Sequence, residues 1–322
     1  MKSLLVISVF LFQCLEWCYS LSDAKTPPMG FNSWNAFKED VNEIQIINTV
    51  NAFKKLNLDK FGYKYVIIDD FWSLPNRSVI GKKLQVNSAK FPRGMEYISD
   101  YIHRNGLKFG IYANAGYKTC GGMAGSLGFE RQDLEQFLDW NIDYLKYDNC
   151  YPNDDREVYH MDKINSLLHF PSMYQYPDEK SRFKPMAEAI KVSNRSIIYE
   201  LCLYGWGNVE DWGKSYGSIW RTAGDIKDRW PSLLANIDIN DSERFVKNQG
   251  RSKGWNYPDA LFIGKGGMTN IEYKTMFTLW SIVKSPLMLG TDLSKITKHS
   301  EEYKVIMVVG LKISAVAILI LG

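Results

Sequence analysis

Three strand-like segments of this chain end on an acidic residue: 65–70, 144–148 and 220–225. Each is a short apolar run, which is typical of a buried strand, and aspartate is unfavourable inside strands. In a parallel barrel, side chains at the carboxyl ends of the strands lie at the mouth, where catalysis takes place. Any one of these aspartates could instead begin a loop or cap a helix. Together, and beside Lys146 and Arg221, they favour a polar functional site.

Strand-like runs alternate with helical patterns almost to the end of the chain. Amphipathic helices are expected at 43–56 and 94–105, for example, and strands at 29–33, 63–70, 107–114, 144–148, 196–202, 218–225, 260–264 and 286–290. This alternation predicts an α/β fold of the (β/α)8 TIM-barrel class. No GxGxxG motif opens the first helix, which argues against a dinucleotide-binding sheet. The segment 151–183 is longer than an ordinary connection and is expected over the active face.

Residues 1–20 predict a signal peptide. Lys2 precedes an apolar run over 4–15, and Cys18-Tyr-Ser offers a cleavage site. The run is too short for a membrane-spanning anchor, so a secreted, extracellular protein beginning near Leu21 is expected. The net charge of +3 does not indicate a nucleic-acid or anionic membrane partner. Three sequons agree with export and predict glycosylation at Asn76, Asn194 and Asn240.

Three cysteines remain after the predicted signal peptide: Cys120, Cys150 and Cys202. An odd number in an oxidising compartment predicts one disulfide and one free thiol. Cys120 and Cys150 follow consecutive predicted strands, and if these are parallel neighbours their carboxyl-end loops lie close enough to bridge. The expected pair is therefore Cys120–Cys150, with Cys202 buried and free.

The expected barrel covers 21–304, and the remaining residues, 305–322, are almost entirely apolar. This tail has three interpretations: the end of the last barrel helix, a membrane anchor, or the artefactual end of a truncated gene. Lys312 and Gly310 interrupt the run, which disfavours the anchor. The last helix followed by a non-native tail is the preferred interpretation.

Five motifs in order carry a resemblance to a known family. They are PMGFNSW at 28–34, IDDFW at 68–72, GIYANAGYKTC at 110–120, YLKYDNC at 144–150 and WRTAGD at 220–225. Over about Ser22 to Lys304 the chain resembles the melibiases, the secreted α-galactosidases of glycoside hydrolase family 27, fungal and yeast enzymes among them. The resemblance implies a (β/α)8 barrel that removes terminal α-galactose from oligosaccharides or glycoconjugates with retention of configuration. It implies no cofactor.

The resemblance assigns the two catalytic carboxyls. Asp148 resembles the nucleophile and Asp225 the acid/base of a double displacement. Lys146 precedes Asp148 by two residues, so both side chains share one face of the strand and Lys146 is expected to keep Asp148 ionised. Asp225 is expected to hold its proton more tightly. The same alternation is expected to bring Arg221 into the pocket.

Further positions resemble sugar-binding residues of the family. Asp69 and Asp70 resemble the pair that grips the 4- and 6-hydroxyls, and metal ligation by this pair is disfavoured because the family uses no metal. Asp259 matches a carboxylate expected in the loop before the seventh strand. The full set of expected binding residues is Trp34, Asp69, Asp70, Tyr112, Lys146, Cys202, Tyr204, Arg221 and Asp259.

Several departures from the family pattern leave alternatives open. A family disulfide is replaced by Phe71 and Glu39, and Tyr257 stands where an acid is common. Leu203 and Tyr204 replace residues that face the sugar 2-substituent in relatives, so α-N-acetylgalactosaminidase is an alternative activity. The chain ends where the family's C-terminal β-sandwich would begin. A third interpretation is therefore an inactive, truncated sugar-binding product.

Overall fold

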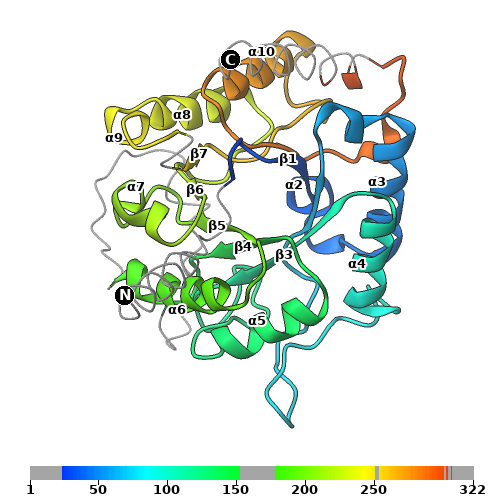
Figure 1. Ribbon diagram of the computed structural model, residues 1–322. Helices are drawn as coiled ribbons and strands as arrows, with labels where there is room; N and C mark the ends of the chain where they lie inside the picture. Colours follow the sequence, from blue (N-terminus) through cyan, green and yellow to red (C-terminus); the bar gives the residue numbers. More distant parts are fainter. Residues whose placement is uncertain (1–23, 153–177, 251–253, 301, 304–305, 307–322) are drawn as a thin grey trace, which may run out of the picture.

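A computed structural model describes residues 24–152, 178–250, 254–300, 302–303 and 306. Within these residues, eight parallel strands form one sheet in the order β7-β6-β5-β4-β3-β2-β1-β8. The sheet curls into a barrel with the helices outside, which confirms the predicted fold class (Figure 1). The strands are β1 (Met29–Asn32), β2 (Tyr65–Ile68), β3 (Lys108–Asn114), β4 (Tyr144–Asp148), β5 (Ile198–Cys202), β6 (Ile219–Arg221), β7 (Trp255–Tyr257) and β8 (Leu287–Leu289).

The seventh strand is not where the sequence predicts it. Strand β7 pairs with β6 but stops before Pro258 and Asp259, where a missing N–H and a φ of 97° break the strand. The predicted strand at 260–264 contains only a single parallel bridge, between Leu261 and Leu289 of β8. This bridge closes the barrel. Since β7 ends at Tyr257, Asp259 lies after the seventh strand, and the prediction that it lies before that strand is wrong.

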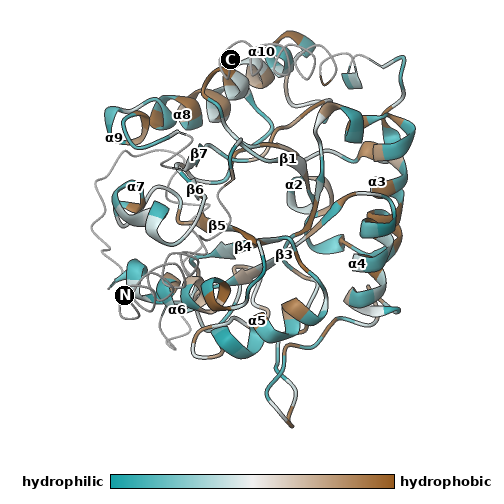
Figure 2. Ribbon diagram, in the orientation of Figure 1, coloured by the Kyte–Doolittle hydropathy of each residue, from teal (hydrophilic) through white to brown (hydrophobic). Residues whose placement is uncertain are grey.

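The helices cover the outside of the barrel. The helices predicted at 43–56 and 94–105 are confirmed as α3 (Glu43–Lys55) and α4 (Gly94–Arg104). Capping boxes begin α3, through Asn42 and Gln45, and α10, through Thr269 and Glu272. Figure 2 shows hydrophilic residues mainly on the outer faces of the helices. The helices are α2 (Ser33–Phe37), α3 (Glu43–Lys55), α4 (Gly94–Arg104), α5 (Glu130–Asp139), α6 (Glu179–Val192), α7 (Val209–Trp212), α8 (Trp230–Asn240), α9 (Glu243–Val246) and α10 (Asn270–Ile282).

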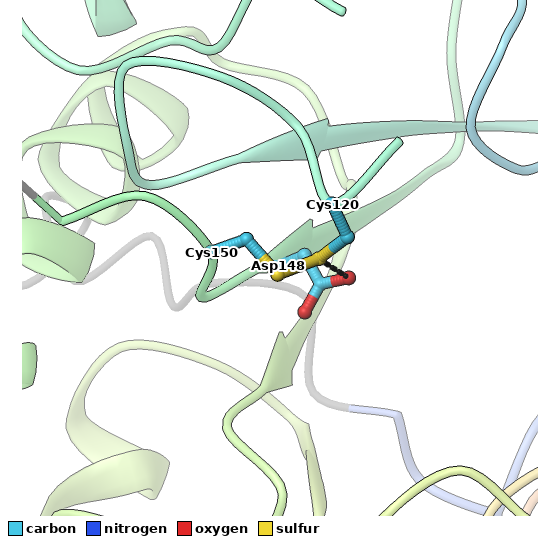
Figure 3. A group of neighbouring side chains, drawn as sticks. All are labelled: Cys120, Asp148 and Cys150. Carbon is cyan, nitrogen blue, oxygen red and sulfur yellow. Dashed lines mark hydrogen bonds between the residues drawn. A yellow bond between two sulfur atoms is a disulfide. The ribbon is translucent and has the colours of Figure 1, made fainter. Parts of the chain in front are cut away.

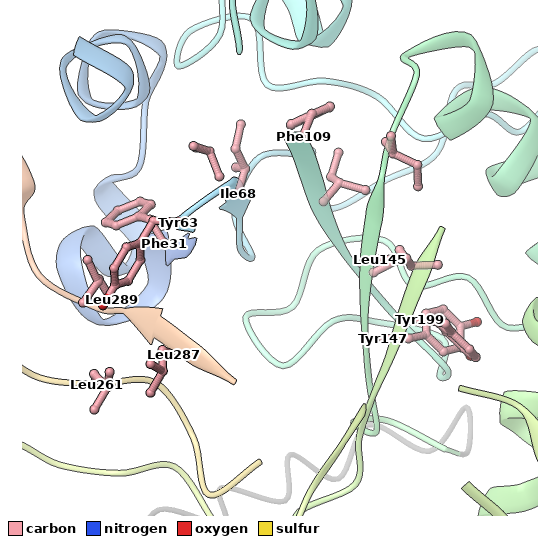
Figure 4. Packing of buried hydrophobic residues seen from close by; sticks show 14 of the residues in the cluster. Phe31, Tyr63, Ile68, Phe109, Leu145, Tyr147, Tyr199, Leu261, Leu287 and Leu289 are labelled. Atoms are coloured by element: carbon pink, nitrogen blue, oxygen red, sulfur yellow. The ribbon is translucent and has the colours of Figure 1, made fainter. Parts of the chain in front are cut away.

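Alternation along each strand separates two buried layers. Leu145 and Tyr147 of β4 point outward and pack in the large cluster between sheet and helices, part of which Figure 4 shows. Tyr144 points inward to a smaller cluster inside the barrel. The period of two therefore places Lys146 and Asp148 on the inner side, as predicted.

Three predictions fall partly or wholly outside the described residues: the signal peptide at 1–20, much of the segment 151–183, and the tail at 305–322. Within the segment 151–183, the residues from Glu179 onward belong to α6. Among the helices that the structure describes, none combines the length and the apolar character needed to cross a membrane.

Candidate active site

The carboxyl end of β4 presents Asp148 inside the barrel mouth. The side chain is 4% exposed, and both carboxylate oxygens are held. The Tyr204 hydroxyl donates to Oδ1 over 2.6 Å, and the backbone N–H of Asn149 donates to the same oxygen over 2.9 Å. The Tyr112 hydroxyl donates to Oδ2 over 2.9 Å. These contacts fix the orientation of a carboxylate that could attack a bound substrate.

Lys146 lies beside this carboxylate in an ion pair with Asp69. Its Nζ donates to Asp69 Oδ2 over 2.7 Å, and Asn32 Nδ2 donates to the same oxygen over 2.7 Å. Burial acts to lower the pKa of Lys146, but the charges around it, Asp69 first, raise that pKa well above its ordinary value. Lys146 is therefore a permanent cation in the floor of the site.

On the other side of the mouth, Arg221 holds two carboxylates. Its Nη2 lies 3.0 Å from Asp225 Oδ1 and 3.3 Å from Asp259 Oδ2. Strand β6 ends at Arg221, so strand alternation does not bring Asp225 to this place; the turn after the strand does. The Arg221 side chain is 1% exposed, whereas Asp225 keeps 38% of its surface open to the mouth. Asp225 is thus the accessible carboxyl of the group.

The pKa values of the two expected catalytic carboxyls differ from the prediction. Burial raises the pKa of Asp148, although Lys146 and the Tyr204 hydroxyl oppose it. Burial also acts to raise the pKa of Asp225, but Arg221 and Lys146 outweigh it and lower that pKa. Lys146 thus favours the ionised form of Asp148, as predicted, but burial has the larger effect and the pKa of Asp148 is raised. The prediction that Asp225 holds its proton more tightly is wrong, because Arg221 stabilises the ionised form of Asp225.

A disulfide joins Cys120 and Cys150 in the loops after β3 and β4, as predicted, and Cys202 is a buried free cysteine. Figure 3 shows the disulfide against Asp148, with Cys120 Sγ 3.1 Å from Asp148 Oδ2. A disulfide sulfur carries no proton, so this is a packing contact and not a hydrogen bond. For the same reason these three residues do not form a thiolate metal site.

The remaining expected binding residues take several roles. Asp70 is buried and ties down the disulfide loop by accepting from the Gly121 N–H over 2.7 Å, and burial raises its pKa to about 6. The Trp34 ring stacks on Phe71, with centroids 6.2 Å apart. Tyr204 reaches Asp148, but Leu203 is fully buried in the outer core. The expectation that Leu203 borders the sugar pocket is therefore wrong.

The sequence reasoning missed one buried charge at the site. Glu200 of β5 pairs in register with Lys146, and its Oε2 accepts from the Tyr144 hydroxyl over 2.6 Å. Burial raises its pKa to about 7. Glu200 lies two residues before Cys202, so the alternation that placed Lys146 could have placed Glu200 inside the barrel too.

The three sequons do not have equal access to solvent. Asn76 and Asn194 are exposed. Asn240 is 1% exposed, and its Oδ1 accepts a hydrogen bond from the Thr222 hydroxyl over 3.0 Å. A glycan on Asn240 does not fit this fold, so that predicted site is withdrawn.

We expect Tyr204→Phe to move the acidic limb of the pH profile upward. The lost hydrogen bond favours the ionised form of Asp148, so its removal raises a pKa that burial has already raised. As the pH falls, a nucleophile with a higher pKa becomes protonated, and so inactive, at a higher pH. Loss of one charge-assisted hydrogen bond should shift this pKa by about one unit. The measurement is kcat/KM against pH. Tyr63→Phe is the control, because the buried Tyr63 hydroxyl has no hydrogen-bond partner among the residues that the structure describes. Equal profiles for both variants would contradict the expectation.

Comparison with known proteins places the chain in a family. It matches the melibiase family described as alpha-galactosidase A over residues 26–169 and 159–311. It is 39% identical over 279 residues to an alpha-galactosidase of Cyamopsis tetragonoloba, covering 86% of this chain and 62% of that protein. It is 36% identical over 290 residues to an alpha-galactosidase of Schizosaccharomyces pombe, covering 84% and 63%. The chain thus spans less than two thirds of either curated relative.

A solved structure gives the same answer. The alpha-galactosidase of Saccharomyces cerevisiae, determined with raffinose, is similar at 30% identity and a TM-score of 0.76. The similarity covers 90% of this chain and 66% of the yeast chain. Sequence and fold therefore agree over the whole barrel, and the chain belongs to the melibiase family of α-galactosidases, glycoside hydrolase family 27.

Proposed function

We propose that this chain is a retaining exo-α-galactosidase that removes terminal α-D-galactosyl residues from oligosaccharides or glycoconjugates. The observation that carries the proposal is the pairing of two differently held carboxyls in one barrel mouth. Asp148 is buried and fixed by hydroxyl donors, whereas Asp225 is accessible and held by Arg221. A retaining glycosidase needs one carboxylate that attacks and one carboxyl that exchanges protons. The raffinose in the yeast relative supports an α-galactoside substrate.

In the first step, Asp148 attacks the anomeric carbon while Asp225, protonated for this step, gives its proton to the glycosidic oxygen. The carbon–oxygen bond breaks, which leaves a β-galactosyl ester on Asp148 and releases the leaving group as an alcohol. In the second step, Asp225 takes a proton from water, and the water attacks the anomeric carbon. The Asp148 ester bond breaks and α-galactose is released.

The charges of the site favour the second step, in which Asp225 acts as a base. The negative charge of Asp225 raises the pKa of Asp148, and the interaction is mutual. Glycosylation neutralises Asp148 and removes that effect from Asp225, which lowers the pKa of Asp225 when it must act as a base. Arg221 lowers that pKa throughout.

The test is hydrolysis of a p-nitrophenyl α-galactoside and of its 2-acetamido counterpart by the purified chain. We expect the galactoside to be hydrolysed at least about tenfold faster in kcat/KM, with α-galactose as the first product by NMR. Preference for the acetamido substrate would establish the α-N-acetylgalactosaminidase alternative. Sugar binding without turnover would establish the inactive sugar-binding alternative.

We also propose that the protein is secreted and carries glycans on Asn76 and Asn194. The predicted signal peptide at 1–20 and the exposure of both asparagines support this. Sequencing of the exported chain should begin near Leu21. An exported chain that retains residues 1–20 would contradict the proposal.

A further inference from the structure

Lys38 occupies an unusual position at the barrel mouth. It follows α2 with φ 52° and ψ −137°, a conformation that suits glycine and is unfavourable for other residues. Its Nζ lies 4.4 Å from the centre of the Trp34 ring and donates to Asn35 Oδ1 over 3.2 Å. A strained backbone therefore carries an ammonium group over an aromatic ring of the candidate site.

The charges that act on Lys38 include carboxylates of the candidate site. Burial lowers the pKa of Lys38, and the carboxylates of Asp225, Asp259 and Asp69 oppose this lowering. In turn, Lys38 is one of the charges that lower the pKa of Asp225. Lys38 follows β1 and α2, and Asp225 follows β6, so both lie at the mouth formed by the carboxyl ends of the strands, where the proposed reaction has Asp225 protonate the leaving oxygen.

Two further lysines contact residues near Lys38 in the sequence or the ring that stacks on Trp34. Lys90 Nζ lies 5.3 Å from the centre of the Phe71 ring, which stacks on Trp34, and it donates to the Glu39 carbonyl oxygen. Lys265 donates to the Asn35 carbonyl oxygen. Within the part of the chain that the structure describes, none of the three lysines, Lys38, Lys90 and Lys265, forms a salt bridge with a carboxylate. The three lysines thus bring positive charge to this part of the mouth, beside the exposed acids Glu39 and Asp40.

We propose that Lys38, above the Trp34–Phe71 pair, forms a binding site for a negatively charged leaving group. The preferred substrate is an α-galactoside whose aglycone carries an anionic substituent such as a carboxylate. The rings contact the body of the aglycone, and the ammonium group contacts its charge. This inference rests on the proposed function, because it assigns the aglycone side of that reaction.

The experiment compares two substrates, 3-carboxyphenyl and 3-carbamoylphenyl α-galactoside, which are similar in size and differ in charge. The quantity measured is the ratio of their kcat/KM values. We expect Lys38→Gln to lower this ratio about fivefold, the effect of one partly exposed ion pair. Comparing the ratio between enzymes cancels the different chemistry of the two leaving groups. Lys38→Arg should keep the ratio, and added salt should reduce it in the unaltered chain.

Lys284→Gln is the matched control. Lys284 is also an exposed lysine with positive φ, 55°, but it lies between α10 and β8 at the opposite end of the barrel. A ratio that stays within twofold in Lys38→Gln, or that falls equally in Lys284→Gln, overturns the inference while leaving the proposed function intact. If neither galactoside is hydrolysed by the unaltered chain, the proposed function fails and the inference falls with it.

Discussion

Asp148→Asn should reduce kcat on aryl α-galactosides by about 10⁴-fold or more, the size of effect found when an enzyme loses its nucleophile. The amide is nearly isosteric, so Tyr112 and Tyr204 should keep their places around it. Galactose binding, measured by calorimetry, should remain within about tenfold of the unaltered chain. Loss of turnover with retained binding separates a chemical role from a structural one.

Replacement of Asp148 by glycine adds a stereochemical test of the same role. In Asp148→Gly, azide should enter the vacated space and attack the substrate directly, which gives β-galactosyl azide. Full activity in Asp148→Asn, or α-galactosyl azide from Asp148→Gly, would remove Asp148 from the role of nucleophile.

Asp225→Ala should give a loss that depends on the leaving group. Without a proton donor, hydrolysis of raffinose should fall by about 10²–10⁴-fold. An activated aryl galactoside should lose less in its first step, because its leaving group needs little protonation. Azide should rescue this variant by attacking the galactosyl ester of Asp148, and the product should be the α-galactosyl azide. The opposite anomer, or an equal loss for both substrates, would contradict the acid/base role.

The structure indicates that Asp225→Ala will fold. Arg221 keeps Asp259 as a partner at 3.3 Å when Asp225 is removed, so no buried charge is left unpaired. Asp238→Ala is a suitable control, because Asp238 is an exposed aspartate on the nearby helix α8. It should leave both substrates unaffected.

The sequence predicts the barrel and the position of Asp148 well, because one physical rule governs both. Apolar runs mark the strands, and alternation along β4 fixes which side Lys146 and Asp148 face. The disulfide follows from the same rule, since parallel neighbours bring Cys120 and Cys150 together.

The failures arise where the backbone leaves regular structure or where distant charges meet. Pro258 and the positive φ of Asp259 end β7 early, and the apolar run after them resembles a strand without forming one. The pKa of Asp225 depends on the path of the turn after β6, which no periodicity describes. The buried Glu200 was not predicted as a site residue because it belongs to no motif, although it faces the same interior as Lys146.

The disulfide beside Asp148 ties the chemistry of the site to the redox state of its surroundings. The sulfurs of Cys120 and Cys150 and a carboxylate oxygen of Asp148 all lie within 4.8 Å of one another. If the disulfide were reduced, the same three residues would offer two thiolates and a carboxylate, which is a favourable ligand set for Zn²⁺. A captured ion would occupy the oxygen needed for attack. The disulfide thus keeps these two sulfurs from acting as metal ligands beside Asp148, and it persists in an oxidising compartment.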